Sequence, residues 1–321
     1  MAVTLKFNVF ASNQLKKLTN TQYCSIYKFF FFFISILIIL KPIQRKITVC
    51  LCTIAKKENL YAKEFIDYYI GLGYDQIFIY DNNDKDDEKL EDVLKKSLYK
   101  NKVTIIDYRG FRGERSTPQF YAYYDCYEKN SKNYDWLSFF DFDEFLVLNK
   151  YKRIKKFLSE KKFKDCENIK INWILYSDNN LIFYDNRKIQ ERFTEPLYND
   201  SENKHIKSTV KGNMKINYWS KLWNPHSSEI NVTTCISTGE KVIDYRSPFQ
   251  FHPNYQYAYL KHYRTKTISE FINKIRRGRA TRPTVYNEKL WKMRLDYFFQ
   301  RNKKTKEKLD YIKKILNINY E

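Results

Sequence analysis

The order of predicted strands and helices in residues 47–107 is the feature that most constrains the fold. Residues 47–54 are continuously apolar or β-branched, as a buried parallel strand requires. Further strands are predicted at 74–80 and 103–107, each after a helical pattern, at 60–72 and 87–99. Because strands that alternate with helices are typical of parallel sheets, these residues predict an α/β fold: a mostly parallel sheet flanked by helices. Ligands of such sheets bind beyond the carboxyl ends of the strands.

Polar residues follow the first two predicted strands, at 56–59 and 81–84. Neither segment contains the Gly-rich loop of a dinucleotide-binding fingerprint or a P-loop. A nucleotide bound here would therefore contact side chains, of which Glu58 and Asp81 are the candidates. The run from Asp81 to Asp84 is also typical of a turn or a helix cap, since Asp and Asn favour both.

Charge is unevenly divided along the chain. The 321 residues include 58 basic and 37 acidic side chains, a net charge of +21 that suggests an anionic partner such as nucleic acid, a membrane surface or phosphates. Residues 1–46 hold seven basic and no acidic side chains, while 47–260 have a net charge of +2 and 261–321 of +12. The nearly neutral middle argues against nucleic acid as a partner. We expect a basic N-terminal segment (1–46), a central working domain (47–285) and a basic amphipathic helical tail (286–321).

Both ends of the chain suggest membrane attachment. Residues 29–40 form an apolar run of twelve residues between cations, shorter than the roughly 20 residues of a spanning helix. The run fits a short anchor or interfacial helix, a helix docked on the domain, or a disordered start, and no signal-peptide cleavage site follows it. The helical pattern from residue 288 fits a membrane surface or docking on the domain. Because the cations favour an anionic leaflet, we expect membrane association at the cytoplasmic face.

The six cysteines do not form a zinc-binding pattern. Cys50 and Cys52 are too close for a zinc knuckle, and no second pair completes a site. Alternation along a strand places both on one face, which predicts buried thiols. Nothing in the spacing calls for an oxidising compartment.

An acidic motif interrupts an apolar stretch at residues 135–148. Three carboxylates, Asp141, Asp143 and Glu144, lie within four residues. In an extended chain, alternation would place Asp141 and Asp143 on the same side, so that their oxygens converge on one cation. Carboxylates in core-like sequence repel and desolvate one another unless a cation neutralises them. The motif therefore favours Mg²⁺ or Mn²⁺ over the alternative, a solvated acidic turn.

Together these segments resemble the glycosyltransferase family 92 / family 2-related group, whose members have a GT-A fold. The early motifs are Lys57-Glu58-Asn59, residues 78–83, Gln119 with Ala122 and Cys126, and Trp136 leading to Asp141-Phe-Asp-Glu-Phe145. The later motifs are Lys207-Ser208, residues 261–264, Ser269-Glu-Phe-x-x-Lys274 and Arg277-Gly278. The resemblance spans roughly residues 47–280.

The resemblance implies a nucleotide-sugar donor, which we expect to be a UDP-sugar, and an acceptor hydroxyl on a glycan or a lipid-linked molecule. Its donor-binding residues would be Glu58, Asp81, Asn82 and Lys207. Its ligands for Mn²⁺ or Mg²⁺ would be Asp141, Asp143 and His262. The resemblance also implies inversion at the anomeric carbon.

A carboxylate must also take the proton from the acceptor hydroxyl. Glu144, beside the metal pair, and Asp178 are the candidates for this catalytic base, and Glu195 is a rival. Two other classes of function remain open. A metal-dependent nuclease or nucleotidyltransferase would use the same acidic motif, but the neutral middle disfavours it. A non-enzymatic basic binding protein would not need buried carboxylates.

Overall fold

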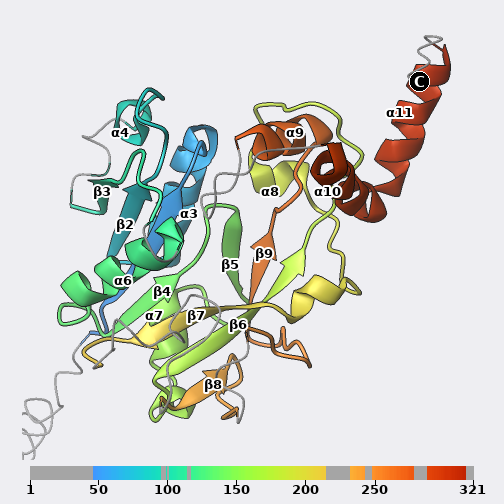
Figure 1. Ribbon diagram of the computed structural model, residues 1–321. Coiled ribbons are helices and arrows are strands. Elements are labelled where there is room, and N and C mark those ends of the chain that lie inside the picture. Colours follow the sequence, from blue (N-terminus) through green and yellow to red (C-terminus); the bar gives the residue numbers. More distant parts are fainter. Residues whose placement is uncertain are drawn as a thin grey trace, which may run out of the picture. The chain divides into compact units, whose positions relative to one another are not determined.

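A mixed sheet of nine strands organises the part of the chain that the computed structural model describes, residues 46–94, 99, 101–113, 117–214, 232–242, 248–277 and 288–315. The strands are β1 (Val49–Ala55), β2 (Gln76–Asp81), β3 (Val103–Asp107), β4 (Trp136–Phe139), β5 (Glu144–Leu148), β6 (Asn168–Leu175), β7 (Ile206–Lys211), β8 (Thr234–Ile236) and β9 (Ala258–His262). Their order is β3-β2-β1-β4-β7-β6-β9-β5, with β8 beside β6 (Figure 1).

The first four strands form a parallel half-sheet, as the sequence predicts. Leu51 in β1 lies opposite Ile77 in β2 on one side and Ser138 in β4 on the other. All seven residues of β1 are buried, which accounts for its continuous apolar run. Five of the eight strand pairings are parallel, so the predicted α/β fold with a mostly parallel sheet is confirmed.

Two helices cover opposite faces of this half-sheet because side chains alternate along β1. Val49 and Leu51 pack into the core that includes residues of α3 (Ala62–Leu72), which follows the short helix η1 (Asn59–Tyr61). Cys50, Cys52 and Ile54 pack on the other face with α6 (Pro118–Asn130). Thr117 caps α6 by accepting from the Phe120 amide, and Pro118 occupies its first turn.

The second half of the sheet is mainly antiparallel. β7 runs antiparallel to β4 and β6, and β5 runs antiparallel to β9. These pairings place His262 of β9 opposite both Glu144 of β5 and Leu175 of β6. Of the smaller elements, α4 (Leu90–Val93) lies between β2 and β3, and the others follow β5: α7 (Ile154–Leu158), η2 (Lys161–Phe163), α8 (Ile189–Arg192) and η3 (Ser201–Lys204).

Three helices close the chain: α9 (Ile268–Arg276), α10 (Glu288–Arg301) and α11 (Lys303–Ile315). Phe271 and Ile275 of α9 form a small core with Phe298 of α10, which is fully buried. Of the two alternatives for the tail, this contact supports docking on the domain for α10. Figure 1 shows α8, α9 and α10 together, and α11 leading away from them.

Two disulfides correct the prediction for the cysteines. Cys52 is bonded to Cys126 of α6, and Cys166 to Cys235 of β8, whereas Cys50 is a free, buried thiol. The predicted thiol at Cys52 is wrong because its partner lies 74 residues away, a pairing that a local pattern does not reveal. Since disulfides persist in oxidising compartments, the pairs argue against the predicted cytoplasmic location.

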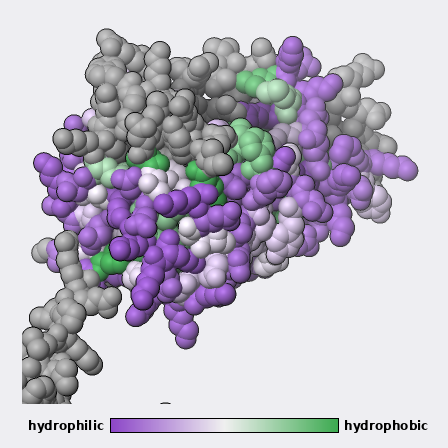
Figure 2. Space-filling view, turned by 90° about the horizontal axis from the view of Figure 1, so that it is seen from below, coloured by the Kyte–Doolittle hydropathy of each residue, from purple (hydrophilic) through white to green (hydrophobic). Residues whose placement is uncertain are grey.

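The described helices and one face of the surface bear on membrane attachment. Within the described ranges, no helix has both the length and the apolar character needed to cross a bilayer. The apolar run 29–40 lies outside the described residues. Figure 2 shows one face on which the described side chains are mostly hydrophilic and the hydrophobic ones gather in small areas.

Candidate active site

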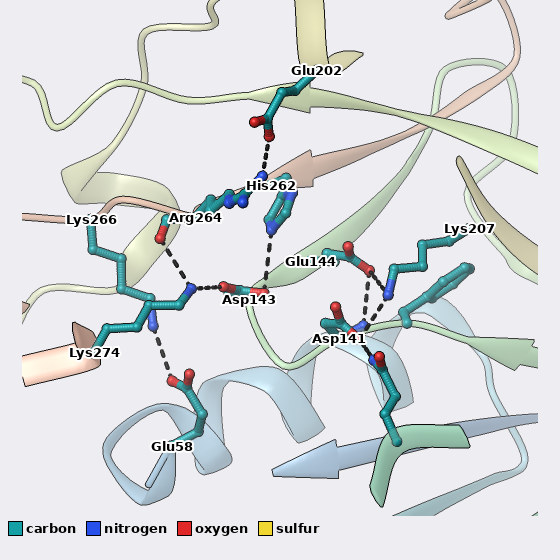
Figure 3. Close-up of polar contacts among 12 residues, drawn as sticks. Glu58, Asp141, Asp143, Glu144, Glu202, Lys207, His262, Arg264, Lys266 and Lys274 are labelled. Carbon is teal, nitrogen blue, oxygen red and sulfur yellow. Dashed lines mark hydrogen bonds and ion pairs between the residues drawn. The ribbon is translucent and has the colours of Figure 1, made fainter. Parts of the chain in front are cut away.

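The acidic motif forms a turn between β4 and β5. The Glu144 amide donates to the Asp141 carbonyl at 3.0 Å, and Phe142 stacks on Phe65 of α3 with ring centroids 4.3 Å apart. The predicted extended chain, with Asp141 and Asp143 on one side, is therefore wrong. Because Phe142 is drawn into the core, the two aspartates contact different groups of residues (Figure 3).

One group, the Asp141 cluster, consists of Asp141, Glu144, Lys207, Gln119 and Tyr123. Lys207 Nζ of β7 lies 2.7 Å from Asp141 Oδ1 and 3.7 Å from Glu144 Oε2. Gln119 and Tyr123 of α6 both donate to Asp141 Oδ1, Tyr123 at 3.0 Å. Lys207 and Glu144 are both 0% exposed, so strand β7 delivers a buried cation to two carboxyl groups.

Burial shapes the ionisation of the Asp141 cluster. It raises the pKa of Glu144 well above its usual value, an effect that Lys207 only partly opposes. Burial also disfavours the charge of Lys207, but Asp141 and Glu144 outweigh it and raise the pKa of this lysine. Glu144 Oε2 accepts from the Asp141 amide at 2.8 Å, whereas Oε1 has no hydrogen-bond partner within the described part of the chain. Glu144 therefore supports the turn from inside.

The other group, the Asp143 cluster, consists of Asp143, Glu58, His262, Lys266, Lys274 and Arg277. Lys274 Nζ of α9 lies 2.6 Å from Asp143 Oδ2, and His262 Nε2 lies 3.5 Å from Oδ1. Burial opposes the charge of Asp143, but Lys274 and His262 hold its pKa well below the usual value. Burial lowers the pKa of His262, which favours the neutral imidazole that can bind a metal.

Glu58 completes the Asp143 cluster from the loop after β1. Its carboxylate lies 3.0 Å from Lys266 Nζ and 2.7 Å from Arg277 Nη2. Burial raises its pKa, but Arg277 and Lys266 more than offset this and lower it. Three basic side chains thus surround two carboxylates, an excess of positive charge beside the carboxyl end of β1 that suits an anionic ligand.

A buried network positions α9, which carries Lys274 and is followed by Arg277 at its C-cap. Arg192 of α8 donates to Glu270 through Nη1 at 2.7 Å and Nη2 at 3.1 Å. Thr267 and Glu270 form a capping box at the start of α9, and Tyr61 also donates to Glu270. The pattern Thr267-x-x-Glu270 is a readable capping signal that our sequence reasoning missed, as it missed Arg192 and Lys266.

The remaining predicted residues have other partners. Asp81 accepts from the amides of Asn83 at 3.1 Å and Leu90 at 2.9 Å, which is the turn alternative. Asn82 donates to the carbonyls of Tyr108 and Phe111. The loops after β1 and β2 do meet, because the Lys57 amide donates to the side chain of Asn83.

The two alternative base candidates lie in another network. Asp178 accepts from the hydroxyl of Thr305 in α11 and from the Asn180 amide at 2.8 Å. Burial raises its pKa. Glu195, in an exposed segment, accepts from Ser177 at 3.1 Å. Asp178 therefore links the segment after β6 to the tail.

The three predicted metal ligands are divided by the turn. Among the described residues, no three His, Cys, Asp or Glu side chains are grouped so that they could share one metal ion. Asp143 and His262 lie together, whereas Asp141 pairs with Lys207. The structure thus assembles Glu58, Asp143 and His262 on one side of the turn, and Asp141, Glu144 and Lys207 on the other.

Comparison with known proteins identifies the family of this chain. The family model of glycosyltransferase family 92 matches residues 45–316. A glycosyltransferase family 92 protein of Ricinus communis is 30% identical over 107 residues, which are 33% of this chain and 18% of the relative. One of Oryza sativa subsp. japonica is 28% identical over 99 residues, 31% and 16% of the two chains. The matched part is thus less than a fifth of either relative. Because the family model covers most of the chain, this protein belongs to glycosyltransferase family 92.

Proposed function

We propose that this protein transfers a sugar from a nucleotide-sugar donor, a UDP-sugar in our prediction, to a hydroxyl of a glycan or lipid-linked acceptor, with inversion. The observation that carries the proposal is the Asp143 cluster, in which Lys266, Lys274 and Arg277 surround Glu58 and Asp143. A nucleoside diphosphate gains negative charge as it leaves the sugar, and preorganised cations stabilise that charge. Family membership supports the same chemistry.

The residues around Asp143 also fit a divalent cation. A carboxylate with a lowered pKa and a neutral imidazole are ligands that suit Mn²⁺, and Asp143 and His262 provide both, 3.5 Å apart. In our proposal these two residues hold Mn²⁺ or Mg²⁺ without Asp141, which pairs with Lys207 on the other side of the turn. The bound cation would neutralise charge on the diphosphate.

Glu144 and Asp178 are the two residues predicted as candidates for the catalytic base. Glu144 has a raised pKa, as a base working near neutral pH needs, but its side chain is fully buried. Asp178 is also buried, and Thr305 and Asn180 occupy its carboxylate. We propose that both residues support the fold and that neither acts as the base. Glu144→Gln and Asp178→Asn test this: loss of turnover with intact donor binding in either variant would identify that residue as the base.

Membrane association remains part of the proposal through the basic ends of the chain. Residues 261–321 have a net charge of +12, and Lys303, Lys304, Lys306 and Lys308 of α11 are exposed. Such a surface is complementary to anionic lipid headgroups. A lipid-linked acceptor would be presented at the same surface.

A panel of nucleotide-sugars incubated with Mn²⁺ tests the proposed function. We expect turnover of one donor by the wild-type protein and a loss of about 10³-fold in kcat/KM in Asp143→Ala. Asp185→Ala is the control, because Asp185 forms an exposed pair with Arg187 that has no contact with the cluster. Metal-dependent cleavage of nucleic acid without turnover of any nucleotide-sugar would overturn the proposal in favour of a nuclease.

A further inference from the structure

Both carboxylates of the Asp143 cluster are already paired with protein groups. Figure 3 shows that Asp143 faces Lys274 through Oδ2 and His262 through Oδ1, and that Glu58 faces Lys266 through Oε2. The other oxygen of Glu58, Oε1, faces Arg277. A divalent cation that binds Asp143 would therefore meet the Lys274 ammonium at the same carboxylate. Like charges this close repel strongly in a partly buried site, so the ammonium must give way.

The three cations differ in how firmly they are held. Arg277 donates to the backbone carbonyls of Lys56 and Lys57 as well as to Glu58. Lys266 is only 5% exposed and lies 3.6 Å above the ring of Tyr61. Lys274 is 28% exposed and, besides Asp143, donates to the Arg264 carbonyl at 3.0 Å.

Lys274 is thus the cation of this cluster that is best placed to move. It projects from the last turn of α9 on a flexible stem, and a lysine ammonium can reorient its three donors toward a new acceptor. A diphosphate beside a metal on Asp143 would offer such an acceptor, because its oxygens are anionic.

We propose that Lys274 is an exchangeable cation: it neutralises Asp143 in the free protein and transfers to the donor diphosphate when a divalent cation takes its place. This inference rests on the proposed function. It assigns Lys274 two opposite effects, since the ammonium competes with the metal but favours the nucleotide. A purely structural ion pair has no such dual effect.

Lys274→Met separates the two effects. We expect Mn²⁺ to bind the metal-free variant about fivefold more tightly, which corresponds to losing a competing ion pair of about 1 kcal/mol. With Mn²⁺ saturating, we expect UDP to bind about tenfold more weakly, because a charged hydrogen bond to phosphate is lost. Electron paramagnetic resonance would follow Mn²⁺, and calorimetry would follow UDP.

Lys155→Met is the matched control, because Lys155 pairs with Asp75 in a half-buried contact that involves no residue of the Asp143 cluster. We expect it to leave both affinities unchanged. Asp143→Asn is a second variant, in case Lys274→Met does not fold. It removes the metal ligand and frees Lys274, so metal-free UDP binding should become severalfold tighter.

The outcomes distinguish this inference from the proposed function. If the wild-type protein binds neither Mn²⁺ nor UDP, the proposed function fails and the inference fails with it. If the wild-type protein binds both, but Lys274→Met shifts the two affinities in the same direction or shifts neither, only the inference is overturned. Unchanged metal-free UDP binding in Asp143→Asn would also overturn it.

Discussion

The Asp141 cluster and the Asp143 cluster begin two residues apart in the chain, yet they are built in different ways. Asp141 is paired with Lys207, which projects from the middle of the sheet and is fully buried. Asp143 is paired with Lys274, which projects from a helix and is partly exposed. The difference lies in which element supplies the cation.

A cation fixed on a central strand has no alternative partner once it is buried. Lys207 is therefore suited to holding the turn, whereas the cations around Asp143 come from the segment after β9, from α9 and from its C-cap, where they suit the anionic ligand that we propose. In this proposal, the acidic motif contains one carboxylate that maintains the fold and one that serves ligand binding. The turn at Phe142 is what separates them.

Replacing Lys207 with Met is the strongest test of this comparison. We expect the free energy of unfolding to fall by about 4 kcal/mol, because Asp141 and Glu144 would lose their buried counter-ion. Lys274→Met should lose less than about 1 kcal/mol, since its ion pair is partly exposed. Urea unfolding measures both. Equal losses in the two variants would contradict the division into a structural and an exchangeable cluster.

The disulfide between Cys52 and Cys126 should also support one cluster more than the other. It joins β1 to α6, which carries Gln119 and Tyr123 of the Asp141 cluster. We expect the double variant Cys52→Ser, Cys126→Ser to lose about 3 kcal/mol of unfolding free energy. Mn²⁺ binding at Asp143 should change little. The double variant Cys166→Ser, Cys235→Ser is the control, because these two cysteines close a loop of similar length. If the variant without the Cys52–Cys126 disulfide lost more of its Mn²⁺ binding than of its stability, the assignment would be refuted.

The fold was predictable from the sequence where one local pattern decided the structure. The parallel half-sheet follows from the continuous apolar run of β1 and from the alternation of the predicted strands with helices. The meeting of the loops after β1 and β2 follows from parallel topology. In each case, residues that are close together in the sequence determine the structure.

The site was less predictable, because contacts between distant residues decide it. Alternation predicts that Asp141 and Asp143 face one way, but the packing of Phe142 on Phe65 turns the chain between them. Lys207 and Lys274 each reach a carboxylate across more than sixty residues of sequence, as their contacts with Asp141 and Asp143 show. The disulfide partners of Cys52 and Cys166 are equally distant. No periodic pattern reports such contacts.

A smaller loss than in the Lys207 and disulfide variants is expected at Glu270, which anchors α9 and so acts on the Asp143 cluster. Burial raises its pKa, but Arg192, Thr267 and Tyr61 more than compensate and lower it. A lowered pKa stabilises the fold above the unfolded value of about 4.3, and this contribution disappears as the pH falls through the folded value. We therefore expect Glu270→Gln to lose about 1–2 kcal/mol of unfolding free energy at pH 7. The difference in unfolding free energy between this variant and the wild type should decrease steadily below about pH 4, as measured by urea unfolding across the acid range. UDP binding should weaken in this variant, because Lys274 belongs to α9 and Arg277 is its C-cap residue. If the difference in unfolding free energy between Glu270→Gln and the wild type stayed constant with pH, the carboxylate charge of Glu270 would not be what holds the helix.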